Sequence, residues 1–170
     1  MATLYKADDR DLAASVLAGE GVHLDPAAIL DGLTNEQALA KPHGLPYSIA
    51  ELVAHMCFWQ EWFNACLLNG FTGIPKHSTD GWPAADPNGW DRLRERYVRA
   101  LDEAKRIAAE SASLADALLP ADANVQSLAR ESRGSALLRA AMHNSHHFGQ
   151  VITMRRLMGL WPPPGGTITW

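Results

Sequence analysis

The stretch from Pro46 to Gly70, "PYSIAELVAHMCFWQEWFNACLLNG", indicates the fold class of this chain. Ser48 stands three residues before Glu51, which is the spacing of a capping box, and Gly70 can end a helix. The segment between them therefore predicts one long helix. Steps of three and four residues along it give a stripe that we expect to be buried, made of Leu52, His55, Trp59, Trp62 and Cys66.

Shorter helices are predicted before this segment. Residues 8–21 form an amphipathic helix with Leu12 on its apolar face and glycines that can end it. Residues 25–32 open with an aspartate N-cap followed by proline, which suits the first helical position. Residues 34–42 open with a second capping box and end at a proline.

A helix is also predicted over residues 89–111. Its apolar side chains recur at helical spacing. On the opposite face, Glu95 and Arg99, and likewise Asp102 and Arg106, have the i,i+4 spacing of ion pairs on a solvated surface.

The remaining chain contains two loops, a last helix and a tail. Residues 71–88 are rich in Gly, Pro, Asp and Ser, and a loop of this length inside a compact domain is usually functional or mobile. A second loop surrounds Pro120. The last helix runs from about residue 134 to 159, and prolines then predict an extended tail. Together these elements predict a single all-α domain, 1–170, folded as a four-helix bundle with short extra helices near the N-terminus.

Composition excludes several classes of function. The net charge of the 170 residues is −4, with no basic cluster, so no electrostatic footprint for nucleic acid is visible. No apolar run reaches about 18 residues and no secretory signal opens the chain, which predicts a cytoplasmic protein with no membrane segment. Cys57 and Cys66 lie too far apart along one helix to form a disulfide with each other.

The last helix contains the unusual stretch "AMHNSHHFGQV", Ala141–Val151. His143 and His147 are spaced i,i+4 on the inward face, close enough for two imidazoles to share one metal ion. His146 is rotated by about 100° from His147 and falls outside this face.

A third ligand must come from another helix, and His55 on the long helix is the natural candidate. A single buried histidine is usually a hydrogen-bonded core residue. Three on converging stripes each need partners for two ring nitrogens in apolar surroundings. A divalent metal provides one partner for all three, so we favour a metal site over the alternative that the histidines are ordinary core residues.

At this point the sequence resembles a known family. "LPYSIAELVAHMCFWQEW" followed by "HNSHHFGQV" is similar to the DinB-like (YfiT-like) superfamily of metal-dependent four-helix-bundle proteins. The resemblance extends to "GEGVHLDPAAILDGL" and "GLWPPPGGTITW", and so to most of the chain. It implies an up-down-down-up bundle, frequent homodimers, and a zinc, nickel or similar ion on His55, His143 and His147. Known members range from thiol-dependent transferases and isomerases to proteins without known activity.

Three imidazoles leave a coordination position open to water or substrate, as in catalytic rather than structural zinc sites. This suggests a hydrolase or a small-thiol transferase acting on a small molecule. The alternative is a non-catalytic metal-binding bundle that serves as a ligand-binding or stress-response module. No catalytic residue is assigned: Glu51 is explained by its capping box, while Gln150 could orient a ligand or simply be solvated.

Overall fold

The fold is taken from a computed structural model that describes residues 9–69, 75–110, 114–115 and 131–166. Within these ranges the chain forms helices and no β-strand, so the all-α prediction is confirmed. The four main helices are α1 (Asp9–Ala18), α4 (Ile49–Asn69), α5 (Trp90–Glu110) and α6 (Arg133–Leu157). Three short elements accompany them, namely α2 (Pro26–Leu30), α3 (Asn35–Leu39) and the 3-10 helix η1 (Ser78–Gly81).

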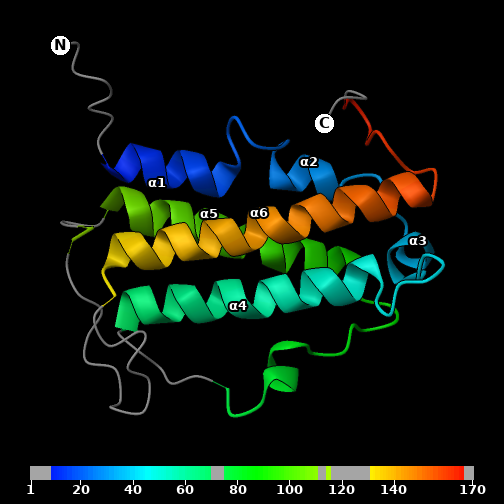
Figure 1. The fold of residues 1–170 in the computed structure, drawn as a ribbon, viewed down its shortest axis with the longest axis horizontal. Helices are drawn as coiled ribbons and strands as arrows, with labels where there is room; N and C mark the ends of the chain where they lie inside the picture. The colour runs from blue at the N-terminus through cyan, green and yellow to red at the C-terminus, as the bar shows by residue number, and fades with distance from the viewer. Residues whose placement is uncertain (1–8, 70–74, 111–113, 116–130, 167–170) are drawn as a thin grey trace.

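The main helices form a bundle in which α1 and α6 run in one direction and α4 and α5 in the other (Figure 1). This is the up-down-down-up order that the family resemblance implied. Helix α1 packs against α5 and α6, and α4 packs against the same two helices from the opposite side. None of the helices among the described residues is long and apolar enough to cross a membrane.

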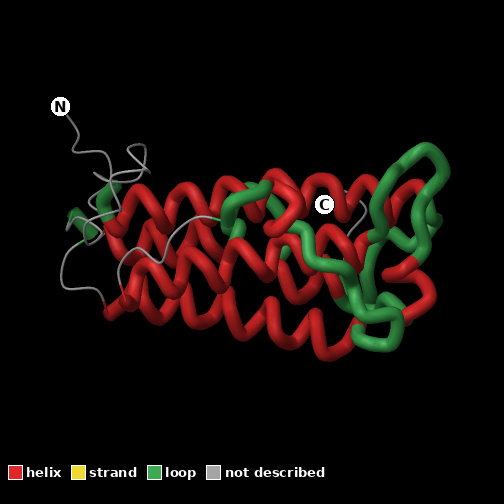
Figure 2. The backbone as a smooth tube through the Cα atoms, turned by 90° about the horizontal axis from the view of Figure 1, so that it is seen from below, coloured by secondary structure: helices red, strands yellow, loops and turns green. Residues whose placement is uncertain are grey.

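The parallel direction of α4 and α5 explains the long connection between them. Each helix has 21 residues and is therefore about 30 Å long, so the chain must return along the bundle before α5 can begin. The described part of this connection, residues 75–89, runs along the outer side of the helices and contains η1 (Figure 2). The bundle order thus places this segment beside α4.

The start of α4 follows the predicted capping box. The backbone N–H of Glu51 donates to Ser48 Oγ at 3.2 Å, and the backbone N–H of Ser48 donates to Glu51 Oε2 at 2.7 Å. Each bond satisfies a backbone donor that the helix cannot pair internally. The same reciprocal pair joins Thr34 and Gln37 at the start of α3.

The core consists of two hydrophobic clusters with a polar layer between them. One cluster contains the first two turns of α4 and the second half of α6, while the other contains the last turns of α4 and the first half of α6. Between the clusters lie buried polar side chains, and these are His55, Gln60, Asn64, Asn144 and His147. A bundle core rarely contains so many polar groups unless each has a partner.

Some predicted details are wrong. Trp59 and Trp62 are half-buried rather than in the core, because the inward face of α4 is completed by Gln60 and Asn64 instead. Leu12 is 55% exposed on α1. As predicted, Cys57 and Cys66 form no disulfide with each other; both are buried, and burial raises the pKa of the Cys57 thiol to about 12.

The predicted ion pairs on α5 are correct in one case of two. Arg99 and Glu95 pair at 3.6 Å. Arg106, however, pairs with Glu103 and Glu110, and Asp102 pairs with Lys105. Neighbours at i,i+3 compete for the same guanidinium, so spacing alone does not select the partner.

The C-terminal tail differs from the extended segment predicted. Its described part turns back at Pro163, whose carbonyl accepts the backbone N–H of Gly166 at 2.9 Å. Pro164 lies against the backbone of Gly32, and Trp161 lies under the guanidinium of Arg156, 5.5 Å from its ring centre. The tail therefore covers its own bundle. The loop predicted around Pro120 lies outside the described residues.

Candidate metal centre

The structure brings the three predicted histidines together where α4 faces α6. His143 Nε2 lies 3.1 Å from His55 Nε2 and 3.2 Å from His147 Nε2. One ring nitrogen from each residue lies within 4.8 Å of the other two, and the group could hold a metal ion. His55 and His147 are 7% and 8% exposed, and His143 is half-buried, so the group opens towards solvent on the His143 side.

Two of these rings have their tautomers fixed by a second contact. His55 Nδ1 lies 2.6 Å from the carbonyl oxygen of Gly81, and His147 Nδ1 lies 2.6 Å from Gln150 Oε1. Both partners are oxygens that only accept, so each Nδ1 carries the proton and donates it. The neutral rings therefore present unprotonated Nε2 atoms to His143.

This arrangement cannot be satisfied by the three rings alone. His143 Nε2 holds at most one proton and can donate it to only one of the two lone pairs, so at least one of the two close N···N contacts has no proton between its nitrogens. A shared cation removes this conflict. Zinc binds imidazole nitrogens at about 2.0–2.1 Å, which places two ligand atoms of a tetrahedral site about 3.3 Å apart. The distances of 3.1 and 3.2 Å match that separation, so the donor set fits a divalent metal.

Burial keeps the three imidazoles in the form that binds metals. Burial, together with the neighbouring rings of His147 and His55, lowers the pKa of His143 to about 4. Burial also lowers the pKa values of His55 and His147. The hydrogen bonds of these residues to Gly81 and Gln150 raise the pKa values and offset part of this effect. All three are neutral at pH 7, as metal ligation requires.

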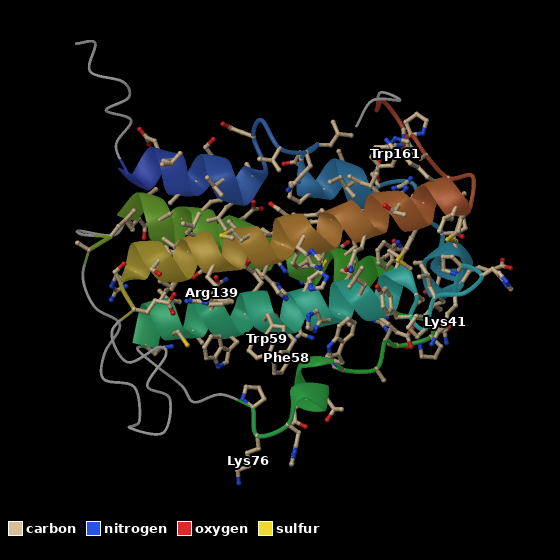
Figure 3. The ribbon with its side chains drawn as sticks, in the orientation of Figure 1. Lys41, Phe58, Trp59, Lys76, Arg139 and Trp161 are labelled. Carbon is tan, nitrogen blue, oxygen red and sulfur yellow. The ribbon has the colours of Figure 1, made fainter. Side chains whose placement is uncertain are left out.

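The connection after α4 completes the surroundings of His55. Trp82 stacks on the His55 ring with centroids 3.8 Å apart and planes inclined by 16°, and Tyr47 lies beside Trp82 at 5.8 Å. Trp59 stands on the side of α4 that faces this connection (Figure 3). A Cβ atom on Gly81 would come within 2.8 Å of Trp59 Nε1, so only glycine lets the backbone approach both Trp59 and His55.

The other residues singled out in the sequence take structural or supporting positions. Glu51 is held in the capping box and by Lys41 at 3.1 Å, as favoured from the sequence. Gln150 supports His147 rather than being free in solvent. His146 is exposed, with its ring centre 5.0 Å from that of His147, and is not part of the group.

Gly81, Trp82 and the buried amide Asn144 were not identified from the sequence. Gly81 and Trp82 belong to "DGWPAADPN", which has no periodicity to show which side chain turns inward. The signal that could have located them is the bundle order itself, because a return connection between parallel helices must pass along α4. Asn144 follows His143 directly, and polar residues on a helix that is buried on most sides must have internal partners.

A helical bundle in which two helices direct three imidazoles at one point fits a metal-binding helical protein. A sequence model of the DinB superfamily matches residues 26–151, a range that contains all three histidines. The chain belongs to this superfamily. No curated protein and no solved structure matched the chain significantly.

Proposed function

We propose that this protein is a metal-dependent enzyme that holds one divalent cation, zinc or nickel, on His55, His143 and His147. The proposal is supported chiefly by the two short N···N distances, which place unprotonated nitrogens around one point with no proton arrangement that satisfies them all. Three ligands leave a coordination position open, which suits a catalytic rather than a closed structural site.

The proposed reaction is hydrolysis, or transfer of a small thiol, on a small-molecule substrate. A divalent cation at this point would lower the pKa of a water or thiol that it binds and polarise a substrate carbonyl. The protein's own residues hold the ligand rings: Gly81 and Gln150 orient His55 and His147, and Trp82 shields one face of His55 from water. A homodimer stays a prediction from the family resemblance.

A second candidate is a metal-binding bundle without catalysis. One observation favours it: among the described residues no carboxylate contacts the three imidazoles, and Glu51 is already engaged by Ser48 and Lys41. A general base would then have to come from the substrate, from solvent or from a histidine. In this case the metal stabilises the fold, because binding free energy becomes folding free energy.

Elemental analysis of protein purified without a histidine tag tests the metal role. We expect about one divalent ion per chain, lost in His143→Ala and kept in His146→Ala, the matched control one helical turn aside. Turnover of ester, amide and electrophile–thiol substrate panels that follows metal content supports the enzyme. A metal that raises the melting temperature without any turnover supports the second candidate, and absence of metal in the wild type refutes both.

A further inference from the structure

Three buried carboxamides cross the bundle core at the level of the histidines. Asn144 Nδ2 donates to Gln60 Oε1 at 2.6 Å, Gln60 Nε2 donates to Asn64 Oδ1 at 2.9 Å, and Asn64 Nδ2 donates to the carbonyl oxygen of Ala100 at 2.7 Å. Their exposed fractions are 3%, 1% and 6% for Asn144, Gln60 and Asn64. The chain of amides runs from α6 through α4 to α5, between the two hydrophobic clusters.

The far end of this chain fixes the orientation of every amide in it. The backbone carbonyl of Ala100 can only accept, so Asn64 must present its nitrogen there and its oxygen to Gln60. Gln60 then presents its oxygen to Asn144, whose nitrogen is used in turn. The oxygen of Asn144 is left over, and Asn144 Oδ1 is buried without a hydrogen-bond partner among the described residues. An unpaired buried acceptor destabilises the fold, so a donor is expected there.

The neighbouring residue, His143, offers a candidate donor. His143 directs Nε2 at the other two imidazoles, and no hydrogen bond to its Nδ1 is found in the part of the chain that the structure describes. His55 and His147 each have an oxygen acceptor for Nδ1, whereas His143 has none. The Asn144 side chain lies close enough to His143 to oppose the lowering of its pKa by burial. The unpaired amide acceptor of Asn144 thus lies next to an imidazole whose Nδ1 has no other acceptor among the described residues.

We propose that Asn144 Oδ1 accepts the Nδ1 proton of His143 and that Asn144 is the positioning residue which directs the His143 Nε2 lone pair at the metal. The amide chain anchors this acceptor across three helices. The proposal rests on the metal role proposed above for the three histidines. It completes a common pattern of metal sites, in which each ligating imidazole donates its other N–H to an oxygen, and loss of such a partner costs about 10–100-fold in metal affinity.

Zinc affinities of three variants separate this role from simple support of the core. Asn144→Leu keeps the branched shape of the side chain but has no acceptor, and we expect it to bind Zn²⁺ about 10–100-fold more weakly in competition with a chromophoric chelator. Asn144→Asp keeps an acceptor and is expected to stay within about threefold of the wild type. Leu67→Ala is the control for lost core packing, because Leu67 is fully buried in the second hydrophobic cluster on the same helix as Gln60 and lies outside the amide chain. Its zinc affinity should be unchanged while its stability falls.

Equal losses in Asn144→Leu and Leu67→Ala would overturn the proposal, since zinc affinity would then follow only the stability of the core. Unchanged affinity in Asn144→Leu would overturn it too. Nitrogen-15 NMR of the metal-free wild type gives an independent answer that needs neither a variant nor a bound ion. We expect His143 to carry its proton on Nδ1, and a proton on Nε2 would refute the hydrogen bond. If the wild type binds no zinc, the proposed function fails, but the NMR result still decides the tautomer.

Discussion

Replacement of Gly81 by alanine should weaken metal binding without weakening the bundle. The new Cβ atom would lie 2.8–2.9 Å from three ring atoms of Trp59, where ordinary contacts are about 3.4 Å or longer. Its backbone needs no left-handed conformation, so the penalty is purely steric. If the backbone withdraws by the missing 0.6 Å or so, the bond between His55 Nδ1 and the Gly81 carbonyl lengthens from 2.6 Å to about 3.2 Å, the limit of a useful hydrogen bond.

The expected loss is about 10–100-fold in zinc affinity, or about 1.4–2.7 kcal/mol, which is typical for a supporting contact of a ligating histidine. Chelator competition measures the affinity and urea unfolding measures the stability. Gly149→Ala on α6 is the matched control: nothing lies within 4 Å of the point that its new Cβ atom would occupy, so zinc affinity should not change and stability should rise by up to about 1 kcal/mol.

A double variant tests the cause. Trp59→Phe removes part of the ring that meets the new methyl group, so Gly81→Ala combined with Trp59→Phe should recover affinity relative to Gly81→Ala alone. Two results refute the reasoning: wild-type zinc affinity in Gly81→Ala, or a double variant whose losses simply add. Either would mean that the connection does not hold His55 in place.

Three further predictions concern residues around the same centre. Gln150→Leu should lower zinc affinity about 10–100-fold and Gln150→Glu should keep it, measured by calorimetry; equal affinities would show that His147 needs no acceptor. Glu51→Ala should destabilise the fold by about 0.5–2 kcal/mol through loss of the capping box, with zinc affinity and any turnover unchanged; a selective loss of turnover would instead identify a catalytic base. Metal-free protein should lose stability as the pH falls from about 6.5 towards 4, because burial lowers the pKa of folded His143 to about 4 and the unfolded chain therefore binds the proton more readily in that window. The loss from His143 is at most about 3 kcal/mol, and urea midpoints that stay constant across this range would contradict it.

The sequence predicts the helices well because their ends are encoded locally. Ser48 with Glu51, and Thr34 with Gln37, form the hydrogen bonds that their spacing indicates, since a cap depends only on residues one turn apart. The sequence also allowed us to predict that His55 lies near the histidines of the last helix, because the apolar stripes of both helices had to face the same core. That the three histidines bind a metal stays a prediction.

The buried polar layer between the two hydrophobic clusters could not be predicted from the sequence in the same way. Counting from Ser48 selected Trp59 and Trp62 as core residues, yet α4 is buried on most of its circumference and the amides of Gln60 and Asn64 turn inward instead. A periodicity count assumes that polar side chains face water. It fails where amides pair with each other across helices, because that pairing depends on three segments distant in sequence.

His55 contacts the connection between α4 and α5 through Gly81 and Trp82. Two of the three histidines lie on α6, where Gln150 follows His147 by one turn and accepts its Nδ1 proton. His55 is held by a segment with little regular structure, which the bundle order forces past α4. The carbonyl oxygen of Gly81 accepts the Nδ1 proton of His55, and Trp82 stacks on the face of the same ring. Metal affinity should therefore respond to substitutions in residues 75–89 that leave the unfolding free energy unchanged, whereas substitutions in the two hydrophobic clusters should change the unfolding free energy first. A scan of both regions in which affinity and stability always fell together would show that the centre is held by the bundle alone.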